Sequence, residues 1–183
     1  MGVPFLPTRS LLGSDLLATS GARELECPFT GERLCLVPAL VPDVALIHVH
    51  RADAKGNAQI DGPPYMDPEL ATAAGKVVVT TERLVPEQEI VATADRTVIP
   101  HFVVDAVVEV PFGSFPHECY GLYGVWFDHL ADYARRVRAD GVAGAEAYLR
   151  ETVDDPGSFE AFLERVGPDV LAECRRDAAA FLA

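Results

Sequence analysis

A nearly continuous apolar run that ends in a polar turn is the feature that most constrains how this chain can fold. Within residues 43–60, Asp43 is followed by Val, Ala, Leu and Ile, and the run then changes to Arg, Asp, Lys, Gly, Asn and Gln. Such a run predicts a strand that helices cover on both faces. Gly56 and Asn57 tolerate positive φ, which suits a tight turn. Because ligands of open α/β sheets bind beyond the carboxyl ends of strands, we expect a site here.

The surrounding sequence predicts strands that alternate with short helices. Prolines and glycines indicate loops over residues 1–30, with one helical turn near residues 14–18. Strands are expected at residues 34–37, 45–49 and 77–81, and one or two more within residues 101–110. Asp67, Pro68 and Glu69 are typical of a helix start, and a second short helix should open at Pro86. This alternation predicts an α/β fold with a mainly parallel open sheet and flanking helices.

The last part of the chain has a different pattern. Trp126, Leu130, Tyr133 and Val137 recur at helical spacing, and Gly141 should end that helix. Further helices are predicted over residues 142–152, 158–166 and 168–182. We therefore expect one domain over residues 1–183, with an α/β core at 1–125 and a helical C-terminal cover at 126–183, whose aromatic stripe should belong to the core.

Net charge restricts the partners of the chain. Its 183 residues carry a formal net charge of −13. A field of that sign repels phosphate backbones, which argues against nucleic acid. The sequence contains no apolar stretch near 20 residues and no signal-peptide pattern, so we expect a cytoplasmic protein without a membrane contact.

The cysteines and histidines are the residues that could form disulfides or bind a metal. The four cysteines are widely spaced and form no CxxC pair. We expect free thiols in a reducing compartment, including Cys27 and Cys35, which could meet across a hairpin. His48 and His50 should share one face of a strand, and with His101 and His117 they could ligate a metal. No carboxylate is placed as an obvious further ligand, so we predict no metal site.

Four segments carry a resemblance to a known family. They are residues 2–10 (GVPFLPTRS), residues 48–59 (HVHRADAKGNAQ), residues 86–90 (PEQEI) and residues 104–113 (VDAVVEVPFG), which run on to Cys-Tyr-Gly at 119–121. In this order they resemble the A-type chain of family I CoA-transferases of the glutaconate type. In that family, strands and a Gly-Gly-Phe loop precede the first segment. We therefore expect a fragment, an incorrectly chosen start or a shortened member, with an open sheet edge that self-association or a partner covers.

The resemblance implies a covalent mechanism. In family I, a glutamate carboxylate attacks an acyl-CoA thioester, forms an acyl anhydride and captures CoA as an enzyme thioester, which an acceptor acid then releases. That glutamate lies in a Ser-Glu-Asn-Gly-like motif of the B-type chain, and this sequence has no such motif. We therefore expect a transferase subunit that is inactive without a B-type partner, with CoA thioester as substrate and no covalently bound cofactor. The acyl acceptor would be a carboxylic or dicarboxylic acid.

The candidate binding residues follow from residue type and from the resemblance. Thr8, Arg9 and Ser10 place a guanidinium between two hydroxyls, which suits a carboxylate or a phosphate. Gly56 allows close approach of backbone N–H groups, beside the amides of Asn57 and Gln59. The remaining candidates are Gly113 and His117.

Glu109 is a further candidate, because it lies between apolar residues. Burial there would raise its pKa unless it were paired. It could be a nucleophile, but we expect a buried ion pair with an arginine.

Two other functions stay open. Some relatives of the transferases open rings of CoA-linked substrates by adding water, with a glutamate whose segment would lie before Met1. A non-catalytic subunit that completes the fold of a partner is the second alternative.

Overall fold

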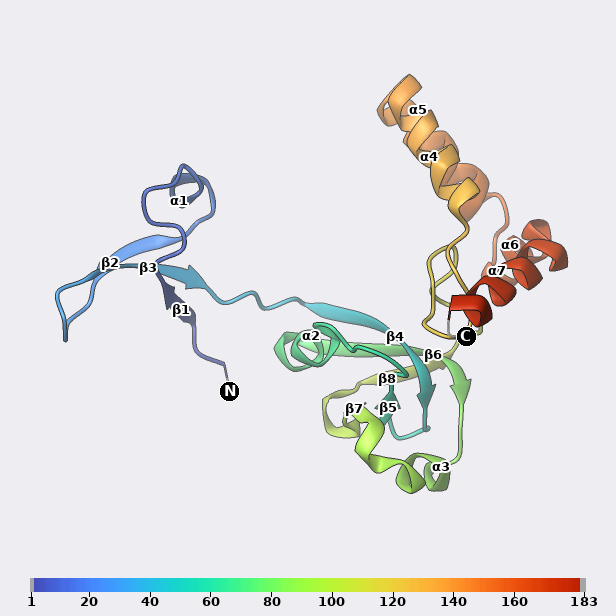
Figure 1. Ribbon diagram of the computed structural model, residues 1–183, viewed down its shortest axis with the longest axis horizontal. Helices are drawn as coiled ribbons and strands as arrows, with labels where there is room; N and C mark the ends of the chain where they lie inside the picture. Colours follow the sequence, from blue (N-terminus) through green and yellow to red (C-terminus); the bar gives the residue numbers. More distant parts are fainter. Residues whose placement is uncertain (1, 182–183) are drawn as a thin grey trace.

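The computed structural model describes residues 2–181. It divides into an N-terminal three-stranded sheet, a five-stranded sheet and a group of C-terminal helices (Figure 1). The N-terminal sheet is joined to the rest by a single extended connection between β3 and β4 (Figure 1).

The N-terminal sheet is small and almost wholly exposed. Its strands run antiparallel in the order β1-β3-β2, and its elements are β1 (Phe5–Thr8), α1 (Leu16–Thr19), β2 (Arg23–Glu26) and β3 (Arg33–Pro38). The loops expected before residue 30 therefore include two strands. Cys27 and Cys35 are free thiols, as predicted.

The five-stranded sheet has the order β7-β5-β4-β6-β8. Its strands are β4 (Val44–Ala52), β5 (Ala58–Gln59), β6 (Lys76–Leu84), β7 (Thr97–Ile99) and β8 (Ala106–Glu109). The three longer ones, β4, β6 and β8, are parallel, whereas β5 and β7 are short and antiparallel. The α/β prediction with a mainly parallel sheet is confirmed, and the sheet is mixed at one edge.

One face of this sheet forms the main core. Alternate residues of β4 and β6, such as Ile47, Val49 and Val79, are buried against Ala71 of a short helix. The helical segments between the strands are α2 (Asp67–Ala73), α3 (Glu87–Ala92) and two 3-10 turns, η1 (Ala94–Arg96) and η2 (His101–Val103). The strand expected at residues 101–110 thus begins with a 3-10 turn.

The C-terminal helices begin at α4 (Phe127–Asp140), as the helical spacing predicts. They continue as α5 (Val142–Leu149), a π-helical turn η3 (Arg150–Asp154), α6 (Phe159–Val166) and α7 (Pro168–Phe181). Gly141, at φ 58°, separates α4 from α5, and the two helices project together from the molecule (Figure 1). No helix of the described residues is both long and apolar enough to span a membrane.

Candidate functional site

Polar side chains gather on one face of the sheet near the carboxyl ends of β4 and β6. His48 and His50 lie two residues apart on β4, so they share a face, as the sequence predicts. His48 is in register with Thr80 of β6, and Glu82 follows on the same face. The loop of residues 112–123 covers these side chains.

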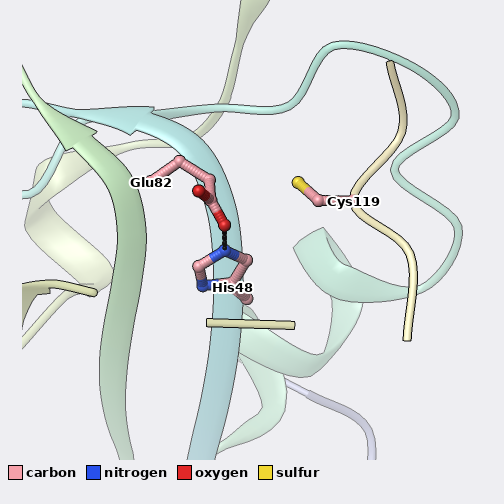
Figure 2. Close-up of side chains that lie close together, drawn as sticks. All are labelled: His48, Glu82 and Cys119. Atoms are coloured by element: carbon pink, nitrogen blue, oxygen red, sulfur yellow. Dashed lines mark hydrogen bonds and ion pairs between the residues drawn. The ribbon is translucent and has the colours of Figure 1, made fainter. Parts of the chain in front are cut away.

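His48 and Glu82 form a half-buried pair. Nε2 of His48 lies 2.8 Å from Oε1 of Glu82, and the two side chains are only 12% and 9% exposed. Nδ1 of the same ring lies 2.9 Å from Oγ1 of Thr80. Figure 2 shows the pair, with the sulfur of Cys119 pointing toward it from the loop.

Glu82 also holds the loop through two further hydrogen bonds. The Tyr123 hydroxyl donates to Oε1 at 2.5 Å, and the Phe112 backbone N–H donates to Oε2 at 2.9 Å. Burial opposes ionisation of Glu82, but the hydrogen bonds from His48, Tyr123 and Phe112 outweigh it and lower the pKa. Glu82 is therefore an ionised acceptor with three donors.

His50 is fixed in one tautomer by the same loop. The backbone N–H of Asp61 donates to its Nδ1 at 3.1 Å, so the proton lies on Nε2, which donates to the Tyr120 carbonyl at 2.8 Å. The Cys119 thiol lies 3.7 Å from this nitrogen. Burial, with the negative charges of Glu82 and Asp61, raises the pKa of that thiol to about 12. Cys119 is thus protonated at neutral pH and is a poor nucleophile.

The side chains of His48, Glu82 and Cys119 offer a metal-type donor set. Their ligand atoms all lie within 4.8 Å of one another, and nitrogen, oxygen and sulfur together would suit zinc. The set fits poorly, however. Both His48 nitrogens and both Glu82 oxygens already have hydrogen-bond partners, and the thiol would have to lose its proton. As it stands, the arrangement fastens the loop to the sheet.

The other side of the loop joins the C-terminal helices. Phe112, Phe115, Cys119 and Tyr123 form a buried cluster with Cys174 of α7. Phe112 has a φ of 63°, which is unfavourable for a residue with a large side chain. Its ring stacks on Tyr123 with centroids 4.7 Å apart, which helps to hold this conformation. The loop therefore couples the sheet to the helices.

A second polar structure is the turn after β4. Asp53 accepts hydrogen bonds at 2.9–3.0 Å from the backbone N–H groups of Lys55, Gly56 and Asn57. Burial opposes its ionisation, but these bonds and one from the Asn57 side chain prevail and lower the pKa. Gly56 has a φ of +106°, as expected for this turn. The backbone donors of the turn thus point inward, at Asp53.

The two amides predicted to meet a ligand are bonded within the chain. Asn57 donates to Asp53 Oδ2 at 2.8 Å, and its Oδ1 accepts from the His101 backbone N–H at 3.1 Å. Gln59 is fully buried and donates to the Thr93 carbonyl at 2.8 Å. Both side chains therefore have a structural function in this protein.

Asn57→Ala should therefore destabilise the fold. Removal of the side chain breaks bonds to Asp53 and His101, one of them to a charged group, so the free energy of unfolding should fall by about 1.5–3 kcal/mol. Urea denaturation monitored by circular dichroism would measure the loss. The exposed ion pair of Lys55 with Glu87 provides the control, because Glu87→Gln should cost under about 1 kcal/mol. Equal effects of the two changes would contradict the assignment.

The other candidate residues lie apart from one another. Thr8 ends β1 in the N-terminal sheet and Arg9 and Ser10 follow it, away from the five-stranded sheet (Figure 1). Thr8 and Ser10 bond each other at 3.0 Å, and Arg9 pairs with Glu32 on the surface. Gly113 lies directly against the His48 ring, and His117 is exposed. The structure therefore brings none of the hydroxyl and guanidinium groups of residues 8–10 to the turn after β4.

Glu109 differs from the expectation. It lies at the end of β8 and is exposed, and its Oε1 accepts from the Leu84 backbone N–H at 2.7 Å. Among the described residues it forms no ion pair with an arginine. The apolar neighbours in sequence mislead because Glu109 is the last residue of β8, an edge strand of the sheet, and is exposed there.

Sequence reasoning missed Asp53, Glu82, Cys119 and Tyr123 as parts of these structures. Asp53 carried a local signal, since an Asp three residues before a Gly is typical of a side-chain-capped turn. Glu82 lies at the end of a β-branched strand, which places it at the carboxyl edge of the sheet. The partners of Glu82 come from 30 to 41 residues away, which no local pattern reveals.

Cys27 and Cys119 should be alkylated at different rates, because their thiols differ in exposure and in pKa. Hydrogen bonds from Thr30 and from nearby backbone groups lower the pKa of Cys27, which is partly exposed. Cys119 is buried, with a pKa of about 12. Iodoacetamide at pH 8 should therefore alkylate Cys27 first and Cys119 only after unfolding, which peptide mass spectrometry would show. Early alkylation of Cys119 would contradict its burial.

Comparison with known proteins gives the family. The family profile described as "Coenzyme A transferase" matches residues 1–110. The chain is 36% identical to the A-type chain of the 3-oxoadipate CoA-transferase of Pseudomonas knackmussii, over 84% of this chain and 55% of that protein. It is 35% identical to the cholesterol ring-cleaving hydrolase IpdA subunit of Rhodococcus jostii, over 75% of the chain and 51% of that protein.

The glutaconate CoA-transferase of Acidaminococcus fermentans matches in both sequence and structure. Its A-type chain is 30% identical over 91% of the present chain and 57% of its own length. The crystal structure of the enzyme superposes with a TM-score of 0.88, at 29% identity, over 95% of the present chain and 60% of the matched one.

The chain spans little more than half the length of these three relatives. The profile nevertheless matches well over half of the chain, and the fold agrees with that of the glutaconate enzyme. The chain belongs to the coenzyme A transferase family and is similar to A-type chains of that family in sequence and in structure.

Proposed function

We propose that this protein is the A-type component of a CoA-transferase that moves CoA between an acyl-CoA and a carboxylic acid. Its family and its similarity to the A-type chains of two transferases support this. The names of both relatives specify a dicarboxylic acid, so we propose a dicarboxylic acid as one substrate. CoA would enter as a thioester substrate, and no bound cofactor is required.

We place the nucleophile of the reaction on a partner subunit. One observation carries this step: neither the buried carboxylate nor the buried thiol beside β4 is available as a nucleophile. Glu82 accepts three hydrogen bonds, and Cys119 keeps its proton. Neither can attack a thioester without breaking the loop contacts. A glutamate of a B-type subunit would form the anhydride and then the CoA thioester, and this chain would supply part of the pocket wall.

Substrate binding by the nine candidate residues stays a prediction. Arg9, Ser10, Glu109 and His117 are the exposed members of this set. Arg9 would have to leave Glu32 before it could bind a ligand. A cytoplasmic location is also proposed, and the four free cysteines support it.

The test is transfer by the assembled protein. The chain alone should show no transfer of CoA from acetyl-CoA to glutaconate or 3-oxoadipate, and co-expression with a B-type subunit should produce it. Intact-mass analysis after incubation with acetyl-CoA should find CoA attached to the partner and not to this chain. Transfer by the purified chain alone, or CoA attached to it, would overturn the proposal. An assembled but wholly inactive complex would favour the non-catalytic alternative.

A hydrolase is the second candidate, because the similarity to a ring-cleaving hydrolase subunit covers three quarters of the chain. The two activities differ in what they require. Transfer needs an acceptor acid and yields that acid as its CoA thioester, whereas hydrolytic ring opening needs only water and keeps the original thioester. Product analysis with and without an added acid separates the two activities.

A further inference from the structure

Aromatic rings of the C-terminal helices and of the loop of residues 112–123 form a row around one histidine. The ring centroid of Trp126, the residue before α4, lies 5.7 Å from that of Phe115 in the loop and 4.5 Å from that of His129 on α4. Tyr148 of α5 follows, with its ring centroid 5.2 Å from that of His129. We call Phe115, Trp126, His129 and Tyr148 the aromatic row. It joins the loop to α4 and α5.

The contact between His129 and Tyr148 depends on the protonation of the histidine ring. Nε2 of His129 lies 2.7 Å from the Tyr148 hydroxyl. Burial is the main cause that raises the pKa of Tyr148, so this hydroxyl keeps its proton at neutral pH. A neutral imidazole can accept that proton at Nε2, whereas an imidazolium has only N–H donors. Protonation therefore forces the hydroxyl to turn its own proton away from the ring.

The side of His129 that faces α6 offers nothing that would compensate a positive charge. The Phe162 ring of α6 lies 6.1 Å from the His129 ring. A cavity of about 430 Å³ is lined by Phe162, Tyr148 and Phe115, and none of the described residues around it is charged. Attraction to the indole face of Trp126 is the favourable contact that an imidazolium would keep.

The charged groups near His129 lie on α4 and on η3. On α4, Asp132 favours a charge on the ring and Arg136 opposes it. Arg136 also pairs with Asp132 at 2.7 Å and with Glu151 of η3 at 2.8 Å, so both carboxylates are already engaged. Burial is the largest cause of the shift, and together with Arg136 it lowers the pKa of His129 below its ordinary value of 6.5.

The lowered pKa gives the effect of acid a definite sign. The unfolded chain takes up a proton on His129 at a higher pH than the folded chain does. The stabilisation by the neutral ring is therefore fully present above about pH 6.5 and is lost as the pH falls from there through the folded pKa. Any further cover over the ring would add to its burial and keep this sign.

The histidine contact lies where α5 passes into the π-helical turn η3. Gly144, one turn earlier on α5, packs against the backbone of α4, where an added Cβ would lie 2.3 Å from the Arg136 carbonyl oxygen. Beyond Tyr148, the ion pair of Arg136 with Glu151 is partly exposed and contributes at most about 1 kcal/mol. We propose that the aromatic row is a proton-sensitive latch: neutral His129 holds the end of α5 and η3 on α4, and protonation of its ring releases them.

Trp126 reports the state of the latch, because it is the only tryptophan of the 183 residues. An imidazolium quenches a stacked indole more strongly than a neutral imidazole does. Tryptophan fluorescence of the full chain should therefore fall in one step between pH 8 and pH 5, with a midpoint below 6.5. His129→Gln should abolish the step, and His101→Gln, an exposed position in η2, is the matched control that should keep it. Asp132→Asn should move the midpoint to lower pH, because Asp132 raises the pKa of His129.

Hydrogen exchange measures the release itself. After correction for the intrinsic pH dependence of exchange, amides of residues 147–154 should exchange about tenfold faster at pH 5 than at pH 7.5, the effect of one pKa unit. The amides of β4 and β6 should not change, because the carboxylate of Glu82 titrates only below about pH 4.5. The pH effect on residues 147–154 should be absent from His129→Gln.

Four results would overturn the latch. They are the absence of a fluorescence step, a step that persists in His129→Gln, a midpoint at or above pH 6.5, and equal exchange of residues 147–154 at both pH values. If His129→Gln does not fold, the Cε1 proton of His129 in the wild type gives the midpoint by nuclear magnetic resonance. A midpoint at or above 6.5 in that titration would count against the latch in the same way, and one below 6.5 would support it.

Discussion

Glu82→Gln should lower the free energy of unfolding at pH 7 by about 1–3 kcal/mol, the usual cost of leaving a buried hydrogen-bond donor without an acceptor. The carboxylate accepts from the His48 ring, the Tyr123 hydroxyl and the Phe112 N–H at 2.5–2.9 Å. A glutamine amide would turn a donor toward at least one of these donors. Urea denaturation would measure the loss, and near-ultraviolet circular dichroism would show whether Tyr123 and its aromatic neighbours lose their fixed packing.

The same carboxylate gives a pH dependence with a defined sign. Its folded pKa is lowered below the ordinary value of 4.5, so the unfolded chain takes up a proton at a higher pH than the folded one. The stabilisation is therefore fully present above about pH 4.5 and is lost as the pH falls through the folded pKa. Glu82→Gln should lack this dependence, whereas the surface change Glu87→Gln should keep it. Identical stability profiles of wild type and Glu82→Gln below pH 4.5 would contradict the assignment.

Gly113→Ala should destabilise the protein, although it adds only a single methyl group. A Cβ at this position would lie 2.5 Å from Cε1 of His48, 2.7 Å from its Nδ1 and 2.9 Å from the Val110 carbonyl oxygen. The ring cannot turn away freely, because Thr80 and Glu82 hold both of its nitrogens. Overpacking of this kind costs about 1–3 kcal/mol. Thermal unfolding should show a fall of about 2–4 °C for each kcal/mol in a chain of this size.

Ser114→Ala is the control for that experiment. It changes the next residue by a similar amount and keeps the backbone N–H that donates to the Tyr123 hydroxyl at 3.0 Å. Its effect should be within about 0.5 kcal/mol. If Gly113→Ala were equally mild, the loop could not lie against His48 as described.

Much of the fold was predictable from local pattern. The strand at residues 45–49 and the strand at 77–81 are β4 and β6, because β-branched apolar runs of that length favour buried strands. The helix that Gly141 should end is α4, which stops at Asp140. The strands β1 and β2 were not predictable, since their residues are nearly all exposed and show no alternation.

The candidate site was less predictable, because it depends on contacts between distant segments. The turn at Gly56 and Asn57 was located correctly, yet residue type alone cannot say whether an amide faces a ligand or its own chain. Asn57 faces Asp53 and His101, and the latter is 44 residues away in sequence. For Glu109, the apolar neighbours in sequence predicted burial, but the residue ends an edge strand and is exposed.

The N-terminal sheet has a consequence for how the molecule opens. None of its described residues belongs to either hydrophobic cluster, and Cys35 is its only buried apolar residue among those described. Because this sheet buries so few apolar side chains, little free energy opposes its local unfolding. Amide hydrogens of β1 to β3 should therefore exchange with deuterium orders of magnitude faster than those of β4 and β6, although both sheets are hydrogen-bonded. The chain would then behave as two cooperative units in exchange, with the slow one confined to the parallel strands.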